Sequence, residues 1–232
     1  MNEIQLSKRL EKIASYIPKK TRLADIGSDH AYLPIFCMLT GKISYAIASE
    51  VIEGPFEKTL AQVDKNDLKS YIEVRLGNGL EAIFLDDEID VITIAGMGGI
   101  LIAEILEMGL QKKRLNGKER LILQPNIGES YVRYWLMNND YQIFVEDIFE
   151  EKQKIYEIIV AQKGIAYYSE QELFFGPFLI EEKKEVFYKK WECELINRRK
   201  ILNSLEKATI PNQKKEEVLQ KEINWIKKVL KK

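Results

Sequence analysis

The sequence predicts an α/β protein built on a seven-stranded sheet and followed by an α-helical hairpin. Through the first 164 residues, short apolar runs alternate with stretches of helical periodicity, which is the pattern of parallel strands covered by helices. Two last strand-like runs, 141–149 and 154–162, are joined by a short charged turn and predict an antiparallel hairpin. After Gly164 the pattern becomes a long, charged helical one. We therefore divide the chain into residues 1–164, which hold the sheet, and residues 165–232, which we call the arm.

The elements of the sheet part follow from its apolar pattern. Leu6, Leu10 and Ile13 lie at helical spacing, and Pro18 would end that first helix, expected at 3–16. The β-branched run 89–95 is typical of a strand that is buried on both faces. The same reasoning predicts further strands at 22–26, 43–49, 71–76 and 121–123, and helices at 31–40, 55–63, 100–109 and 128–137.

The arm is expected to form two helices. A helical pattern runs over 170–206 and is interrupted only by Gly176-Pro177, and a turn around 209–212 leads into a last helix. Two helices joined by a short turn predict an antiparallel, coiled-coil-like hairpin. Three residues recur every seven positions, as in a coiled coil: Leu179, Val186 and Cys193. The arm is too short to bury a core of its own, so it should pack on the sheet part.

The composition is that of a soluble globular protein, with 46% hydrophobic and 31% charged residues. No run approaches the length of a membrane span, and the first residues lack the apolar core of a signal peptide, so we expect a cytoplasmic protein. Cys37 and Cys193 lie far apart on helical segments and predict reduced, buried or half-buried thiols. A single histidine leaves little scope for a His-built metal centre, so no metal is expected. Separately, a monomer is favoured.

Charge is distributed unevenly along the chain. The net charge of −1 divides into −5 over residues 1–164, from 20 basic and 25 acidic residues, and +4 over residues 165–232, from 15 basic and 11 acidic residues. An acidic half can hold a cationic cofactor, and a basic half can meet a polyanion. The imbalance permits a nucleic-acid partner without requiring one, because helices rich in Lys and Glu are usually solvated faces.

The stretch 21–30 is the centre of the predicted site. Its apolar strand ends at Gly27, the chain then enters a helix that Asp29 or Ser28 could cap, and this turn leaves backbone N–H groups free. Glu50 lies 23 residues beyond Gly27, at the end of the second strand, where an acid can bind a ribose diol. A nucleoside cofactor is therefore expected.

The turn favours S-adenosylmethionine (SAM) over a dinucleotide. The dinucleotide fingerprint needs three spaced glycines for a pyrophosphate, whereas Gly27 stands alone among polar and acidic residues. Asp25 or Asp29 could lie near the ammonium and sulfonium groups of SAM. The competing interpretation is that the first turn of any α/β protein is polar, and the second acid, Glu50, weighs against it.

Four Gly- or Pro-bearing segments should lie together. They follow predicted parallel strands at Gly27, 77–79, 96–99 and 124–126. The carboxyl ends of parallel strands meet at one edge of a sheet, which is where such sheets bind ligands. We call this edge the rim.

These segments resemble the bacterial tRNA adenine-N1 methyltransferases that act at position 22 of the D-arm. The resemblance covers most of the first 164 residues and is carried by Ala24-Asp-Ile-Gly-Ser-Asp-His-Ala-Tyr-Leu-Pro34, Ser49-Glu-Val51, Gly54-Pro55, Gly77-Asn-Gly-Leu80, Ala95-Gly-Met-Gly-Gly99 and Gln124-Pro-Asn126. It implies a SAM-dependent, Rossmann-like methyltransferase that acts on tRNA. It also implies roles around SAM: Asp25, Gly27, Ser28 and Asp29 at the methionine end, Glu50 and Val51 at the ribose, Asn78 and Gly79 at the adenine, and Ala95 and Gly96 at the methyl group.

Methylation of ring N1 makes modest chemical demands. N1 of adenine has an in-plane lone pair and is unprotonated at neutral pH, so alignment matters more than a base. Asp29 could stabilise the cationic ring that forms, and His30 is either a proton handler for the N6 amino group or a histidine packed at a helix N-terminus. The target base must first be exposed. Rim residues that could hold it, or could simply be packing, are Tyr32, Met97 and Asn126.

Two basic segments are candidates for phosphate contacts. The first is the loop 112–120, with Lys112, Lys113 and Arg114 at its start. The second is the arm, with Lys183, Lys184, Lys189, Lys190, Arg198, Arg199 and Lys200.

Three other functions remain open from the sequence. A small-molecule methyltransferase would share the rim but have no use for the basic segments. A SAM-binding RNA adaptor would bind both ligands without turnover. A nicotinamide dehydrogenase is disfavoured by the single glycine of the first turn.

Overall fold

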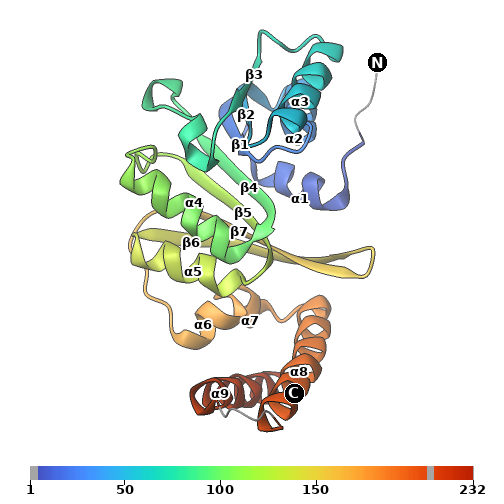
Figure 1. Cartoon of the computed structure of the whole chain (residues 1–232), viewed down its shortest axis with the longest axis vertical. Helices are drawn as coiled ribbons and strands as arrows, with labels where there is room; N and C mark the ends of the chain where they lie inside the picture. Colours follow the sequence, from blue (N-terminus) through green and yellow to red (C-terminus); the bar gives the residue numbers. More distant parts are fainter. Residues whose placement is uncertain (1–4, 208–211, 232) are drawn as a thin grey trace.

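The computed structural model describes residues 5–207 and 212–231. Within this part of the chain, seven strands form one sheet in the order β3-β2-β1-β4-β5-β7-β6 (Figure 1). The strands from β1 to β5 pair in parallel, and β7 runs antiparallel to both β5 and β6. The strand bounds are β1 (Thr21–Ile26), β2 (Ile43–Glu50), β3 (Ile72–Leu76), β4 (Val91–Gly98), β5 (Arg120–Ile127), β6 (Tyr141–Glu151) and β7 (Lys154–Lys163). The predicted α/β fold with a seven-stranded sheet is confirmed.

Helices cover both faces of the sheet, so the sheet part has three layers (Figure 1). One core lies under α4 (Gly99–Gln111) and α5 (Glu129–Asn138), and the other lies under α1 (Lys8–Tyr16), α2 (Tyr32–Leu39) and α3 (Glu53–Lys65). Successive strand residues point to opposite cores, as Ala46 and Ile47 of β2 do. Two short 3-10 helices, η1 (Gly79–Ala82) and η2 (Leu85–Asp87), connect β3 to β4.

Two predicted turns at the rim are strand ends instead. The ladder between β4 and β5 continues through Met97↔Pro125 and Gly98↔Ile127 after a register shift between Ala95 and Met97. Gly96 lies in that bulge with φ of +78°, a backbone conformation that glycine adopts without strain. The motifs 96–99 and 124–126 therefore lie side by side on paired strands, which holds them more firmly than loops would.

The interruption expected at Gly176-Pro177 is present, and a second one follows at Lys183, so the pattern over 170–206 forms three helices: α6 (Glu170–Phe175), α7 (Leu179–Glu182) and α8 (Glu185–Glu206). The first break falls at Gly176, whose φ is +95°, and the second at Lys183, which is left-handed with φ of +46°. Residues that end a helix in this way leave the helical sequence pattern around them intact. Of the first helix, predicted over 3–16, residues 3–4 lie outside the described residues and residues 5–7 are not helical; the helix begins at Lys8, where the Ser7 side chain caps it.

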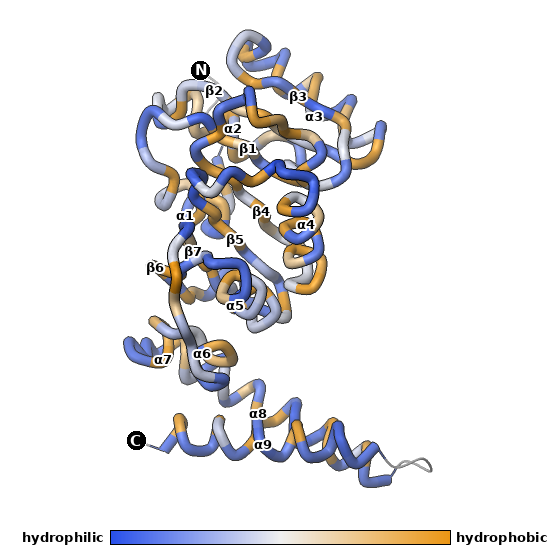
Figure 2. Tube along the Cα trace, turned by 90° about the vertical axis from the view of Figure 1, so that its left-hand side faces the viewer, coloured by the Kyte–Doolittle hydropathy of each residue, from blue (hydrophilic) through white to orange (hydrophobic). Residues whose placement is uncertain are grey.

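In the arm, α8 packs against α9 (Gln213–Leu230), and hydrophilic residues predominate along both (Figure 2). The buried residues of α8 are Phe187 and Trp191, one helical turn apart, and Ile226 of α9 lies in the same cluster. The heptad of Leu179, Val186 and Cys193 is not the seam, because Leu179 belongs to α7 and Cys193 is exposed. The expectation of a buried or half-buried thiol is thus wrong for Cys193 and right for Cys37. Of the predicted turn, residues 209–211 lie outside the described residues.

None of the helices in the described ranges is long and apolar enough to cross a membrane.

Candidate active site at the rim of the sheet

Asp25 is the buried acid at the end of β1. It is 5% exposed and accepts hydrogen bonds from the hydroxyl groups of Ser28, at 2.6 Å, and Thr93, at 2.5 Å. Burial raises the pKa of the Asp25 carboxyl to about 6, although both hydroxyl groups oppose that shift. A cation placed beside Asp25 would therefore be bound well, because it would relieve the burial of an unpaired negative charge.

Glu50 ends the neighbouring strand. It is 8% exposed and accepts a hydrogen bond from Thr59 of α3 at 3.1 Å. In the parallel ladders, Ile26 lies beside Ser49, and Glu50 lies beside Leu76 of β3, directly before the Gly77-Asn78-Gly79 turn. The second predicted acid thus lies between the first acid and the Asn78 turn, which is the spatial order that a nucleoside with a charged tail requires.

The first turn is tighter than its sequence indicates. A Cβ on Gly27, whose φ is +67°, would lie 2.4 Å from the Met97 Cε atom, so the turn after β1 touches the end of β4. After Ser28, three consecutive residues, Asp29, His30 and Ala31, are left-handed, with φ of 43°, 63° and 54°. Such a run is strained for residues other than glycine and is typical of functional sites.

This run overturns the predicted helix cap. The N-cap of α2 is Ala31, which has no side-chain hydrogen bond, while Ser28 bonds to Asp25 and the Asp29 side chain is 83% exposed. Asp29 instead lies beside His30, with 3.8 Å between its Oδ1 atom and the His30 Nε2 atom. The His30 ring centroid is 5.5 Å from that of Tyr32, so the three predicted residues form one group, in which Asp29 and Tyr32 are exposed and His30 is half-buried.

Gln124 joins the ends of β4 and β5. Its side chain is fully buried, and its Oε1 atom accepts hydrogen bonds from the Gly96 N–H, at 3.1 Å, and from the Arg9 guanidinium, at 2.7 Å. Its Nε2 atom lies 3.3 Å from the Asn126 Oδ1 atom, and Asn126 donates to the Gly96 carbonyl at 2.8 Å. Two predicted residues, Gly96 and Asn126, are thereby held in one fixed arrangement.

Sequence reasoning missed Gln124 and Arg9 as site residues. Gln124 had a usable signal, since it opens the Gln-Pro-Asn motif and a buried amide on a central strand needs partners. Arg9 had none, because 115 positions separate it from Gln124.

The basic loop 112–120 lies away from the rim. It connects the end of α4 to the start of β5, so it occupies the amino edge of the sheet, opposite the carboxyl ends of the strands. Lys112 pairs there with Glu81, and the Arg114 guanidinium lies 4.6 Å from the centroid of the Phe84 ring. The structure therefore does not bring this loop together with the other predicted site residues.

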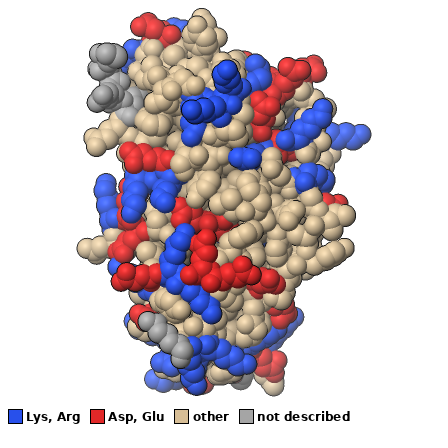
Figure 3. Space-filling model, turned by 180° about the vertical axis from the view of Figure 1, so that it is seen from behind, with Lys and Arg blue, Asp and Glu red and all other residues tan. Residues whose placement is uncertain are grey.

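Several basic residues of the arm are already paired. Lys190 lies between Glu129, at 2.5 Å, and Glu157, at 2.6 Å, and Arg198 pairs with Glu194 and Glu222. The other ion pairs are Lys184 with Glu182 and Asp147, and Lys189 with Glu150. In the face drawn in Figure 3, acidic and basic side chains accordingly mix across the middle, while Lys and Arg gather at the arm end. Within the described residues, the predicted cations that are exposed and form no ion pair in the arm are Lys183, Arg199 and Lys200.

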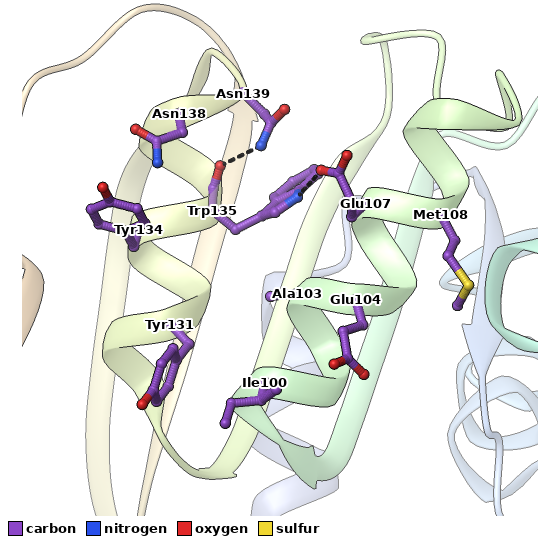
Figure 4. Close-up of a pocket in the computed structure, with 10 residues that line it drawn as sticks. All are labelled: Ile100, Ala103, Glu104, Glu107, Met108, Tyr131, Tyr134, Trp135, Asn138 and Asn139. Atoms are coloured by element: carbon purple, nitrogen blue, oxygen red, sulfur yellow. Dashed lines mark hydrogen bonds between the residues drawn. The ribbon is translucent and has the colours of Figure 1, made fainter.

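Two hollows flank the rim where α5 begins. One, of about 530 Å³, lies between the rim and the arm and is lined by Asn126, Tyr131 and Arg198, among others. The other, of about 600 Å³, lies between α4 and α5, where Trp135 donates to Glu107 at 2.9 Å (Figure 4). Tyr131 lines both hollows, so they adjoin each other. No group of three or more His, Cys, Asp or Glu side chains within residues 5–207 and 212–231 is placed to hold a metal ion.

Comparisons with known proteins agree on one family. Residues 23–228 match the family model described as TrmK, tRNA (adenine(22)-N(1))-methyltransferase. The Bacillus subtilis tRNA (adenine(22)-N(1))-methyltransferase is 49% identical over 224 residues, which cover 94% of this chain and 93% of that protein. The crystal structure of the B. subtilis m1A22 tRNA methyltransferase TrmK superposes with a TM-score of 0.92 at 45% identity, covering 98% of this chain and all of that one. M. capricolum TrmK, solved with the cofactor product S-adenosylhomocysteine, has a TM-score of 0.83 at 33% identity and 97% coverage of both chains.

Proposed function

Because this chain belongs to the tRNA (adenine(22)-N(1))-methyltransferase family, we propose that it transfers the methyl group of SAM to N1 of adenosine 22 in the D-arm of tRNA. The observation that supports the rim as the reaction site is the alignment of Asp25, Glu50 and the Gly96–Asn126 pair along one edge.

In this proposal each part of the cofactor meets a group that suits it. Asp25 receives the ammonium and sulfonium end, with Gly27, Ser28 and Asp29 around it. Glu50 accepts hydrogen bonds from the ribose hydroxyl groups, with Val51 beside it. The adenine lies by Asn78 and Gly79, and the methyl group faces Ala95 and Gly96. The buried acids fit a cationic nucleoside, since they form no ion pair within the described residues.

The residues of the chain then act mainly by positioning. Bound SAM supplies an electrophilic methyl group on a sulfonium. Adenine N1 attacks that carbon with its in-plane lone pair, the carbon–sulfur bonding pair stays on sulfur, and the ring gains a positive charge. Asn126 and Met97 hold the base in line, and Asp29, exposed beside His30, stabilises the developing charge. No general base is needed for this step.

We further propose that residues 1–164 bind SAM and that residues 165–232 bind tRNA. Exposed, unpaired cations within the described part of the arm, Arg199 and Lys200 among them, would meet phosphates. We also propose a cytoplasmic location, since the tRNA substrate is found there. The monomer expected from the sequence stays a prediction.

The deciding test uses two tRNA transcripts that differ only at position 22, one with adenosine and one with guanosine. We expect incubation with labelled SAM to label the first transcript alone and nucleoside mass spectrometry to identify 1-methyladenosine. SAM binding without turnover on either transcript would favour the RNA adaptor. Methyl transfer that does not depend on tRNA would favour a small-molecule substrate.

A further inference from the structure

The turn between β6 and β7 is built from two residues in an unusual conformation. Glu151 pairs with Lys154, so the turn consists of Lys152 and Gln153, whose φ angles are +48° and +65°. A two-residue turn with positive φ at both positions is of type I′, for which Asn-Gly is the preferred sequence. Lys and Gln adopt this conformation with strain, and strained backbone is typical of functional sites. The other run of consecutive non-glycine residues with positive φ in the described chain is 29–31, at the rim.

The hairpin carries this turn past the carboxyl edge of the sheet. The ladder between β5 and β7 ends at Leu123↔Ile159, and the first residues of β7 continue beyond it paired with β6 alone. Because β7 is antiparallel to β5, its start lies on the side where β5 ends, which is the rim (Figure 1). There Gln153 lines the hollow between the rim and the arm, as Asn126 does. The turn therefore stands beside the place where the target base would be held.

Contacts from two helices fix the hairpin next to its turn. On one side, the Glu151 carboxylate accepts hydrogen bonds from the backbone N–H groups of Lys8 and Arg9 in α1, at 2.8 Å and 3.3 Å. On the other side, the Glu150 carboxylate accepts from the Lys189 Nζ atom of α8 at 2.6 Å. The turn thus has a defined position between the sheet part and the arm, although its own side chains are exposed.

The turn also presents free cations. Lys152 and Lys154 are exposed and form no ion pair with any residue that the structure describes. Lys154 lies opposite Glu151 across the hairpin, a position in which opposite charges attract. Both oxygens of Glu151 are instead bonded to the start of α1, which leaves Lys154 available. Two cations on either side of a polar amide suit a nucleic acid strand, in which phosphates lie on either side of each base.

We propose that residues 152–154 enter the D-arm of tRNA at the target base, where Gln153 takes the space that the exposed adenine leaves and the two lysines bind the adjacent phosphates. This inference rests on the proposed function. Taking a base out of a duplex costs its stacking and pairing energy. A side chain in the vacated space offsets part of that cost, and the Gln amide has both a donor and an acceptor for the base left without a partner.

The test gives the turn its preferred sequence, in the double variant Lys152→Asn and Gln153→Gly. Two tRNA transcripts carry adenosine 22 opposite either a uridine or an abasic site, so that the target must be unpaired only in the first. Single-turnover rates are measured with enzyme in saturating excess, so that weaker tRNA binding does not affect them. We expect the variant to methylate the uridine transcript about tenfold more slowly than the wild-type protein does, and the abasic transcript at a rate within about twofold.

Two further measurements separate this role from a structural one. A fluorescent adenine analogue at position 22 brightens when it leaves the base stack, and the wild-type protein with S-adenosylhomocysteine should cause that brightening while the variant should not. The variant should bind SAM with wild-type affinity in calorimetry. It should unfold at the same urea concentration as the wild-type protein or at a higher one, because Asn-Gly relieves the turn.

A matched control is Lys20→Gly. Lys20 is also an exposed lysine with positive φ, of +62°, but it directly precedes β1, at the edge of the sheet opposite the rim. Its replacement likewise removes one cation and relieves one strained residue. It should leave the methylation rates of both transcripts unchanged.

Three results would overturn the inference. Wild-type rates and wild-type brightening with the double variant would mean that the turn takes no part in exposing the base. Equal losses of rate on both transcripts would mean that the turn acts after the base is exposed. A loss of SAM affinity would mean that the turn supports the fold of the rim. In each case methylation by the wild-type protein still stands, whereas its failure to methylate either transcript would reject the proposed function itself.

Discussion

The rim and the junction between sheet and arm both bury charged groups, but they treat those charges in opposite ways. At the rim, Asp25 and Glu50 are bonded only to hydroxyl groups and form no ion pair within the described residues. At the junction, every buried charge meets its opposite: Arg133 with Glu146 and Glu157, and Lys190 with Glu129 and Glu157.

The unpaired charges of the rim suit ligand binding, whereas the paired charges of the junction hold parts of the protein together. A buried charge that lacks a counter-charge lowers stability and persists where a ligand supplies the partner. A closed set of ion pairs fixes the relative positions of the segments that carry it. Here Lys190 connects α8 to the first residue of α5, next to the rim, so the junction sets where the arm stands relative to the site.

The largest effect is expected when the junction is opened. Arg133→Met would leave Glu146 and Glu157 buried without their cation, which should lower the free energy of unfolding by about 3–5 kcal/mol. Equilibrium denaturation in urea measures this. Lys189→Met is the matched control, because its ion pair with Glu150 is exposed and should contribute less than about 1 kcal/mol. Equal losses in the free energy of unfolding for the two variants would contradict the distinction between buried and exposed ion pairs.

At the rim, removing a charge should stabilise the protein. The pKa of Asp25 is about 6 in the folded state against 3.8 in its ordinary state, so the folded protein holds this proton more firmly. Ionising Asp25 in the folded protein therefore lowers the free energy of unfolding. This loss grows as pH rises from about 4 to about 6 and is complete above that range. Asp25→Asn should therefore unfold with a free energy on the order of 2 kcal/mol higher at pH 7.5, and with no difference near pH 4.

The same variant should lose affinity for SAM, because the counter-charge for its cationic end is gone. A gain in stability together with a loss of binding is the expected signature. An Asp25→Asn protein that is destabilised at pH 7.5 would show that the carboxylate is needed by Ser28 and Thr93 instead.

Glu50→Ala should weaken SAM binding about tenfold, since charge-assisted hydrogen bonds to the ribose would be lost. Calorimetry measures this, and Glu53→Ala, an exposed acid in the first turn of α3, is the control. Unchanged affinity after Glu50→Ala would mean that the ribose does not bind at the end of β2.

The smallest effect is expected on the outer surface of the arm. Charge reversal of Arg199 and Lys200 should weaken tRNA binding several-fold and flatten its salt dependence, because fewer counterions are released. Arg198 is left intact, since it holds α8 to Glu222 of α9 at 2.8 Å and its reversal would disturb the arm itself. Normal binding by the double variant across salt concentrations would place the phosphate contacts elsewhere.

The sequence by itself determined the parts of the site that follow from local pattern. A strand that ends at Gly27, an acid at the end of the next strand and the Asn78 turn are each visible within a few residues. Parallel pairing then brings them to one edge whatever the details of packing. The predictions of the fold, the cofactor and the family are confirmed for this reason.

The tertiary structure alone decided which charged side chains are free. Lys190 and Arg198 look like Arg199 and Lys200 in the sequence, yet the first two are taken up by acids from other elements. The loop 112–120, predicted as a candidate for phosphate contacts, lies at the edge of the sheet opposite the rim because it follows a helix, and its sequence alone does not give that place. Arg9 meets Gln124 across 115 positions of sequence. Partners of a long, charged side chain are set by distant packing, and no local pattern records them.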